Sequence, residues 1–272
     1  MQTIHYVMAD PSGNTTILVL DRIDRADHSV VAAKLLASEA LEAEQVAYLT
    51  MDPADGTALR IDMMGGEFCG NASRSAAAYA LSLTREDKGM YRVSCSGCTV
   101  PLGVAVERKG DVFQAVIDMP LPESVEAVLI PVNDLPYRFF KVTLPGIVHF
   151  VYFVQTGDNV DKEIYWQALR EYVSTDAYAA YGLIIVDTQA LTMVPAVYVA
   201  ETDTRYWERS CGSGSAAAAA ALACVGRRNV ACTLRQPGGA IAIAAKVDDG
   251  ELQSLRIGGT VALSAVQTVL IE

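Results

Sequence analysis

The sequence predicts an α+β protein with two pseudo-symmetric domains, each a curved, mostly antiparallel sheet wrapped around a central helix of small residues. Three observations predict this fold class. The 272-residue chain is 51% hydrophobic, which is enough for one large core or two ordinary ones. A Cys-Gly pair twice precedes an alanine-rich run, in EFCGNASRSAAAYAL and in WERSCGSGSAAAAAALA. Strand-like and helix-like runs precede each pair in a similar order.

The first half begins with runs that are short and rich in β-branched or aromatic residues, which is typical of strands. These runs lie at 15–20, 45–50 and 58–64. Residues 27–45 carry apolar side chains at helical spacing and predict a helix. A small-residue helix from Asn71 to about Leu83 follows the first Cys-Gly pair. Two hairpin-like runs at 91–120 turn at 109–111, where Lys-Gly-Asp favours a turn.

The second half repeats this order. Its strand-like runs lie at 137–144, 147–154, 181–187 and 193–201. Residues 160–175 predict a helix. The second small-residue helix extends to about Arg228, and its segment SAAAAAALACV is apolar all round, so we expect it to be buried on every side. A hairpin at 238–259 and a final strand at 260–272 end the chain.

The pseudo-repeat predicts the domain boundaries. We expect a first domain at 1–119, a second at 120–262, and a closing strand at 263–272 that returns to the first half. The join near 119–123 has no long linker rich in Pro, Gly or Ser. Two such domains can close over a small molecule and exclude water.

Charge and composition argue against several partners. The net charge is −11, from 21 basic and 32 acidic residues, so we expect neither nucleic acid nor an anionic membrane surface. No window approaches the ~18 uncharged apolar residues of a membrane helix. The first residues lack the basic and apolar regions of a secretory signal, so the cytoplasm is the expected location. The oligomeric state stays open, with a homodimer as one option.

Four of the six cysteines are expected to be packing residues. A cytosolic chain of this size rarely needs disulfides. Cys95 and Cys98 form a C-x-x-C pair, but a zinc site would require a second close pair. Cys224 and Cys232 are too widely spaced for that and have no histidine nearby, so we expect no metal.

The other two cysteines, Cys69 and Cys211, each stand where a helix is expected to begin. A helix N-terminus exposes unpaired N–H groups and about half a positive charge. It can hold a carboxylate, and we expect it to lower the pKa of an adjacent thiol from ~8.5 toward neutrality. Asn71 and Ser213 offer N-cap or substrate hydrogen bonds.

The duplication of this junction favours chemistry over packing. A single buried cysteine before glycine is usually only a small apolar residue. Two junctions, one per half, predict two bases on opposite faces of one Cα. One thiolate would remove the proton while the other thiol delivers one, and the helix ends would stabilise the developing enolate. Racemisation requires this arrangement.

Four segments, PSGNTT, EFCGNA, WERSCGSGSAA and QPGGAIAI, resemble the cofactor-independent diaminopimelate epimerase superfamily, which includes proline racemase-like enzymes and histidine racemases. The resemblance spans nearly the whole chain. It implies two pseudo-symmetric domains, catalysis by Cys69 and Cys211, no pyridoxal phosphate or other cofactor, and a small amino acid as substrate.

The resemblance also implies a set of substrate-binding residues, each at a position that matches the family pattern. They are Asn14, Glu44, Gln45, Gly70, Asn71, Glu208, Arg209, Gly212 and Ser213. In the family, the residues after each cysteine clamp the substrate carboxylate. Glu208 matches a residue that contacts the substrate amino group, and Arg209 stands beside it.

Departures from the diaminopimelate epimerase pattern bear on the substrate. Ile147 stands where that enzyme has the asparagine of a GNPH motif, and a second asparagine is replaced within YGLIIVD. These changes remove partners for a distal carboxylate, and an unpaired charge in a closed pocket is costly. The variant pattern is similar instead to histidine racemases of opine-type metallophore pathways, whose imidazole substrate has no distal carboxylate.

The preferred interpretation is therefore an amino-acid racemase that acts on histidine. Diaminopimelate epimerase, which converts the LL to the meso form, and a racemase for another amino acid remain alternatives. A cysteine hydrolase would need a histidine partner, and its candidate, His149, is expected to be a core residue. A non-catalytic amino-acid binding protein would use the same residues. Pyridoxal phosphate dependence is disfavoured, because no phosphate-binding loop or suitable lysine is evident.

Overall fold

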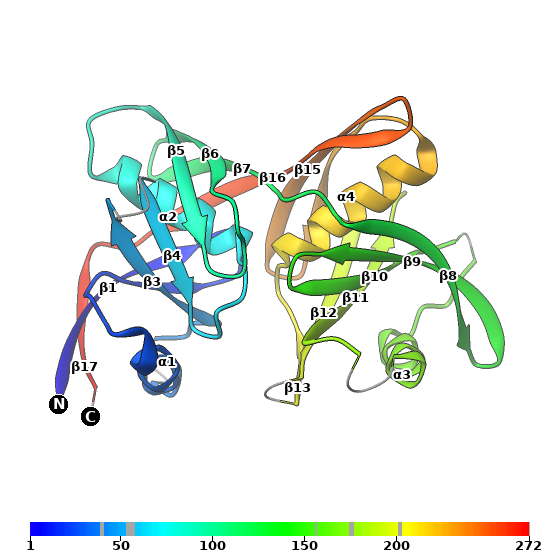
Figure 1. Ribbon diagram of the computed structural model, residues 1–272, viewed down its shortest axis with the longest axis horizontal. Coiled ribbons are helices and arrows are strands. Elements are labelled where there is room, and N and C mark those ends of the chain that lie inside the picture. The colour runs from blue at the N-terminus through cyan, green and yellow to red at the C-terminus, as the bar shows by residue number, and fades with distance from the viewer. Residues whose placement is uncertain (39–40, 53–57, 156, 174–176, 201–202, 272) are drawn as a thin grey trace. The chain divides into compact units, whose positions relative to one another are not determined.

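The computed structural model describes residues 1–38, 41–52, 58–155, 157–173, 177–200 and 203–271 (Figure 1). The described chain is mixed α+β and consists mostly of strands, which confirms the predicted class. It divides into two compact units. Unit 1 comprises Met1–Asp118 and Gly258–Glu272, and unit 2 comprises Met119–Ile257.

Unit 1 is a mostly antiparallel set of strands. Its strands are β1 (Gln2–Asp10), β2 (Thr16–Val19), β3 (Gln45–Met51), β4 (Leu59–Met63), β5 (Lys88–Cys95), β6 (Leu102–Lys109), β7 (Val112–Asp118) and β17 (Gln267–Ile271). Neighbours pair in the order β17-β1-β2-β3-β4-β5-β6-β7, and only β2–β3 and β4–β5 of these pairs are parallel. Strand β16 (Glu251–Leu263) begins in unit 2 and ends in unit 1.

Helix α2 (Gly70–Ser82) is the centre of unit 1. Its residues from Gly70 to Leu81 are all buried except Tyr79. Strands β2, β4, β5, β6 and β7 all contact it, and small side chains permit this close approach. A second helix, α1 (His28–Leu36), follows a short 3₁₀ turn (Arg25–Asp27) and packs Val31 and Leu35 into a separate cluster with β1, β2 and β3.

Unit 2 repeats much of this plan. Its strands are β8 (Ser124–Val132), β9 (Leu135–Leu144), β10 (Ile147–Phe153), β11 (Ala180–Asp187), β12 (Thr192–Val199), β13 (Thr204–Trp207), β14 (Val230–Gln236) and β15 (Gly239–Asp248). The run β8-β9-β10-β11-β12-β13 is antiparallel except for the parallel pair β10–β11. An antiparallel pair, β14–β15, joins β12 through one parallel contact.

Helix α4 (Gly212–Gly226) is the counterpart of α2. The alanines from Ala216 to Ala221 have no exposed surface, as expected, but the end of the segment is not buried on every side, because Val225 is 56% exposed. Strands β8, β9, β10, β11, β14 and β15 contact the helix (Figure 1). Gly214 is closely packed, because a Cβ there would lie 2.5 Å from Cδ1 of Ile184 and 3.1 Å from Sγ of Cys211. The other helix of the unit, α3 (Lys162–Tyr172), packs Trp166 and Leu169 into an aromatic-rich core.

Several elements differ from the sequence prediction. Strands β1, β8, β13 and β14 were not predicted, and β1 and β8 show why, because each mixes exposed and buried residues without regular alternation. The helix expected at 27–45 ends at Leu36, and residues 39–40 of that range lie outside the described chain. The final strand at 260–272 is interrupted at Ser264, which exchanges two hydrogen bonds of 2.9 Å with the backbone of Met8.

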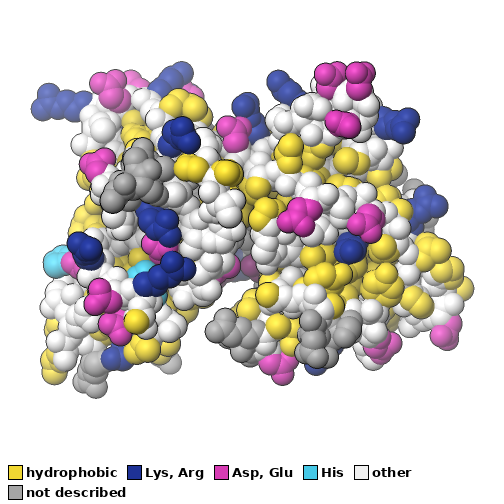
Figure 2. Space-filling model, viewed as in Figure 1, with side chains coloured by type: hydrophobic (Ala, Val, Ile, Leu, Met, Phe, Trp, Pro, Cys, Tyr) yellow, Lys and Arg dark blue, Asp and Glu magenta, His cyan; other side chains and the backbone are white. Residues whose placement is uncertain are grey.

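The surface mixes both charges. In Figure 2, acidic and basic side chains are interspersed on the visible face of each unit. Within the described residues, no helix has the length and apolar character required to cross a membrane.

Candidate active site

In unit 1, Cys69 is the N-cap of α2. Its backbone is extended, and its sulfur accepts the N–H of Ala72 at 3.4 Å. The hydroxyl of Ser73 donates to the Cys69 carbonyl at 2.9 Å. The first turn of the helix therefore holds both the thiol and the backbone of this cysteine, which is half-buried.

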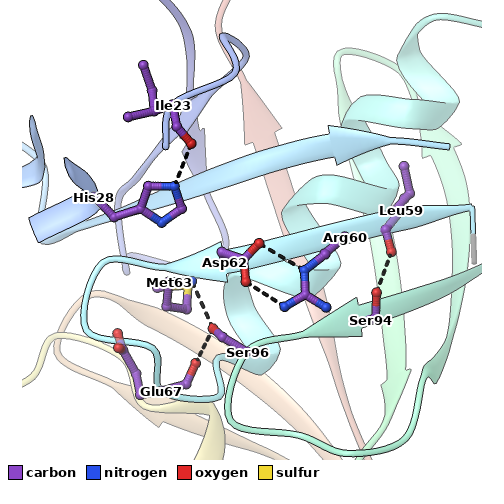
Figure 3. A network of polar contacts seen from close by, with 9 residues as sticks. All are labelled: Ile23, His28, Leu59, Arg60, Asp62, Met63, Glu67, Ser94 and Ser96. Carbon is purple, nitrogen blue, oxygen red and sulfur yellow. Dashed lines mark hydrogen bonds and ion pairs between the residues drawn. The ribbon is translucent and has the colours of Figure 1, made fainter. Parts of the chain in front are cut away.

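The loop before Cys69 is braced by the segment after β5. Ser96 accepts the N–H of Met63 at 2.9 Å and donates to the carbonyl of Glu67 at 2.7 Å (Figure 3). Gly97 lies so close to the loop that a Cβ would be 2.4 Å from the nitrogen of Phe68, and its φ of +70° favours glycine. The SCSGC motif thus supports the Cys69 loop, a role that the sequence analysis missed.

Four of the predicted site residues form one hydrogen-bond network with Cys69. The side-chain amide of Gln45 lies 3.5 Å from the Cys69 sulfur and donates to Oδ1 of Asn14 at 2.9 Å. Asn14 donates to Glu44 at 2.8 Å, and Asn71 donates to Oδ1 of Asn14 at 3.1 Å. Strand β3 supplies Gln45 and the segment before β2 supplies Asn14, so the β2–β3 pairing brings distant segments to the helix entrance.

Arg74 is the residue of this site that the sequence analysis overlooked. Its side chain has no exposed surface, although it carries a guanidinium group. It donates to Oδ1 of Asn71 at 2.8 Å and approaches the carbonyl of Ala115 at 3.5 Å. Burial lowers the pKa of Arg74 to about 10, while the nearby Cys69 acts in the opposite direction. The one signal in the sequence was a basic residue inside a run of small ones.

The Cys69 thiol does not have the lowered pKa that its place at a helix end predicts. Burial raises the pKa of Cys69 to about 12, although the N–H of Ala72 and the amide of Gln45 act to lower it. The charges of Cys95 and Glu67 raise it further. The expectation of a near-neutral thiol pKa was therefore wrong, because the loss of hydration outweighs the helix end.

In unit 2, Cys211 is the N-cap of α4 and is held in a similar way. Its sulfur accepts the N–H of Gly214 at 3.2 Å, and Ser215 donates to its carbonyl at 2.6 Å. Its own N–H donates to Oε1 of Gln236 at 2.8 Å, and the amide of Gln236 donates to Ser215 at 2.9 Å. Cys211 is 4% exposed, so it is the more buried of the two thiols.

The surroundings of Cys211 include a carboxylate. Burial raises the pKa of Cys211 well above its ordinary value, and the charge and hydrogen bonding of Glu208 raise it further. The hydroxyl of Ser213 and the N–H of Gly214 act to lower it. Arg209 differs from its neighbour Glu208, because its side chain is exposed and its carbonyl accepts the N–H of Gly238 at 2.7 Å. The structure therefore brings Glu208 and Ser213 to the thiol and leaves the Arg209 side chain outside.

His149 is linked to this thiol through a serine. Its Nε2 lies 2.9 Å from the hydroxyl oxygen of Ser213, which lies 3.6 Å from the Cys211 sulfur. The imidazole has no exposed surface, and burial lowers its pKa to about 3, so it is neutral. Its Nδ1 has no hydrogen-bond partner among the described residues. His149 is buried as expected, but its link to Ser213 could not be read from the sequence.

The two sites differ in which strand supplies the large polar side chain. In each unit, a strand–helix–strand crossover pairs two strands in parallel, β2 with β3 and β10 with β11. The register places Thr16 beside Gln45 in unit 1 and His149 beside Gly182 in unit 2. Gly182 must be small, because a Cβ there would lie 2.4 Å from Nδ1 of His149. The larger side chain of the pair is therefore Gln45 on β3 in unit 1 and His149 on β10 in unit 2.

Comparisons with known proteins agree with this architecture. The model of the histidine racemase CntK N-terminal domain matches residues 3–270. A histidine racemase of Fusobacterium nucleatum is 33% identical over 226 residues, which cover 80% of each chain. A histidine racemase of Staphylococcus aureus is 28% identical over 254 residues, which cover 90% of this chain and 89% of that protein.

A solved structure shares the fold. The probable proline racemase of Agrobacterium radiobacter K84 superposes with a TM-score of 0.70 at 11% identity, over 99% of this chain and 93% of that one. This structural similarity concerns the fold alone, whereas the sequence matches are to histidine racemases. Because the family model spans nearly all of the sequence, the chain belongs to the histidine racemase family.

Proposed function

We propose that the protein is a cofactor-independent histidine racemase that interconverts L- and D-histidine. The observation that carries this proposal is that each unit presents a cysteine as the N-cap of a buried small-residue helix. Membership of the histidine racemase family supports histidine as the substrate. The proposal requires that both thiols reach opposite faces of one Cα.

Cys69 and Cys211 are the two bases in this mechanism. One thiolate removes the Cα proton, and the other thiol returns a proton to the opposite face. The raised pKa values suit this task, because the Cα proton is weakly acidic and a thiolate of high pKa is a stronger base than one of neutral pKa. Glu208 favours the protonated form of Cys211, which can donate the proton, while Ser213 and the N–H of Gly214 favour the thiolate that results.

The remaining site residues would hold the substrate. The N–H groups of Gly70, Asn71, Gly212 and Ser213 lie in the first turns of α2 and α4, where backbone donors can bind a carboxylate. Asn14, Glu44 and Gln45 form a connected polar surface beside Cys69, which we assign to the amino group or the imidazole. The exposed Arg209 has no assigned contact in this scheme.

The direct test is proton exchange in heavy water. Purified protein incubated with L-histidine in D₂O, without any added cofactor, should form D-histidine that carries deuterium at Cα. Chiral chromatography with mass spectrometry measures both products. Absence of exchange would favour a binding protein, and turnover of LL-diaminopimelate without turnover of histidine would favour the epimerase.

The cellular setting remains a prediction. We propose a cytoplasmic enzyme that supplies D-histidine to an opine-type metallophore pathway, as the resemblance to that group of histidine racemases implies. Sedimentation velocity of the purified protein measures whether it forms a homodimer.

A further inference from the structure

Arg74 is a fully buried cation, and no carboxylate of the described residues pairs with it. Its partners among the described residues are Oδ1 of Asn71 and the carbonyl of Ala115, and its Nε has none. A buried charge is costly unless it is paired, and neutral oxygens compensate it only in part. A negative charge nearby would therefore stabilise the Arg74 guanidinium.

The group placed to carry that charge is Cys69. Arg74 is the fifth residue after Cys69 on α2, and a chain of hydrogen bonds joins the two. It runs from Arg74 to Asn71 at 2.8 Å, from Asn71 to Asn14 at 3.1 Å, and through Gln45 to the sulfur at 3.5 Å. Among the described residues, the Cys69 thiolate is also the anionic group whose charge acts on the guanidinium.

We propose that the guanidinium of Arg74 is the buried countercharge for the Cys69 thiolate. The attraction between two charges is mutual, so a cation that is favoured by the thiolate favours the thiolate equally. Arg74 is then a positioning residue that acts through Cys69 and does not touch the substrate. This inference deepens the proposed function, because it rests on Cys69 working as a base.

The other groups that face Cys69 do not supply a positive charge. Glu67 in the preceding loop and Cys95 on β5 both oppose ionisation of the thiol. Gln45 on β3 and the N–H of Ala72 on α2 favour ionisation, but both are neutral. Among the described residues, Arg74 is the cation whose charge interacts with that of Cys69.

A purely structural role for Arg74 is the competing explanation. The guanidinium joins α2 to β7 through the carbonyl of Ala115, and it orients Asn71. If that were its whole purpose, removal of the charge would change stability but not the ionisation of Cys69. The two explanations therefore differ in the pH dependence of the thiol.

The test compares Arg74→Gln with Arg74→Lys. Glutamine can still reach Asn71 but has no charge, whereas lysine keeps the charge. Iodoacetamide reacts with thiolates only, so the alkylation rate of the Cys69 peptide, measured by mass spectrometry from pH 6 to 11, reports the thiolate fraction.

We expect Arg74→Gln to lower the Cys69 alkylation rate at pH 8 about tenfold, as for a rise of about one pKa unit. In Arg74→Lys the alkylation rate of Cys69 should stay close to that of the parent protein. The alkylation rate of the Cys98 peptide serves as the internal reference. Equal rates and equal pH profiles for all three proteins would overturn the proposal. A uniform change at every pH in both variants would assign Arg74 to structure alone.

A second measurement leaves Arg74 in place and so does not depend on the folding of its variants. Beside a buried cation, Cys69→Asp should unfold at a higher temperature than Cys69→Asn at pH 7. The matched pair at the other helix, Cys211→Asp and Cys211→Asn, should show the opposite order beside Glu208. The same order at both helices would contradict the proposal. Neither measurement involves histidine, so failure of the proposed function would not be mistaken for failure of this inference.

Discussion

The entrances of α2 and α4 have the same backbone but different charges. In both, the cysteine sulfur accepts the N–H of the third residue after it. In both, the serine four residues on, Ser73 or Ser215, donates to the carbonyl of the cysteine. The position after that serine is Arg74 in unit 1 and Ala216 in unit 2. The comparison teaches that the repeat preserves the hydrogen bonds that hold a thiol and not the charges around it.

The charges make the two thiols unequal. Cys69 has the buried guanidinium of Arg74 in its surroundings as well as the charge of Glu67, whereas Cys211 has the Glu208 carboxylate, which also forms a hydrogen bond with it. A nearby cation favours a thiolate, whereas a nearby anion favours a thiol. We therefore expect Cys69 to be the readier base and Cys211 the readier acid before substrate binds.

The largest expected effect comes from removing either sulfur. Cys69→Ser and Cys211→Ser should each lower histidine racemisation by on the order of 10³-fold, because a serine hydroxyl is a much weaker acid than a thiol. Chiral chromatography measures the rate. The half-buried Cys232, on β14, is the control, and Cys232→Ser should keep nearly full activity. Full activity in either single variant at the helix entrances would refute the two-base mechanism.

The second effect separates the two entrances by charge. Glu208→Gln should lower kcat about 10- to 100-fold, since the carboxylate that keeps Cys211 in its proton-donating form is lost. The same change should lower the pKa of Cys211, because Glu208 holds that pKa up. The alkylation profile of the Cys211 peptide should then move to lower pH, while that of the Cys69 peptide stays in place. A shift in both peptides would indicate a general loosening of the fold.

The third effect concerns the close packing of Gly182 against His149 on the parallel strands of unit 2. Gly182→Ala would place a Cβ 2.4 Å from Nδ1 of His149 and 2.9 Å from the carbonyl of Ala196. Because the backbone at Ala196 cannot move easily to make room, we expect a loss of about 2–3 kcal/mol in the free energy of unfolding. Gly226→Ala is the control, since its Cβ would meet only the flexible side chain of Arg228. Urea denaturation measures both, and equal stability would contradict the packing described.

The fourth effect is a change in the pH dependence of stability. His149 has a folded pKa of about 3, below its unfolded value of ~6.5, so the unfolded chain binds the proton first. The stability contributed by the neutral ring is present above pH 6.5 and is lost as the pH falls toward 3, by up to about 1.4 kcal/mol per pH unit. His149→Gln should remove this slope, and His5→Gln, at an exposed position, should retain it. An unchanged slope in His149→Gln would show that other groups cause it.

The sequence could predict the parts of the site that depend on local pattern. The two cysteines, their glycines and the buried helices follow from residue spacing alone, and the described structure places each cysteine as an N-cap. Arg74, Ser96 and the link between His149 and Ser213 depend on strand register, which is a tertiary property. The predicted direction of the Cys69 pKa shift was also wrong. A sequence motif does not show how deeply its thiol is buried.

The larger side chain of the parallel strand pair is on the second strand in unit 1 (Gln45) and on the first strand in unit 2 (His149). This difference bears on how the two halves diverged. If they descend from a duplicated gene, the larger side chain of the pair changed strands between the two halves. An alignment of the two halves would then show dissimilar residues at these paired positions, although the positions are structurally equivalent. An artificial chain built from one half repeated would give both sulfurs identical surroundings, and it would lose the division of labour between donor and acceptor.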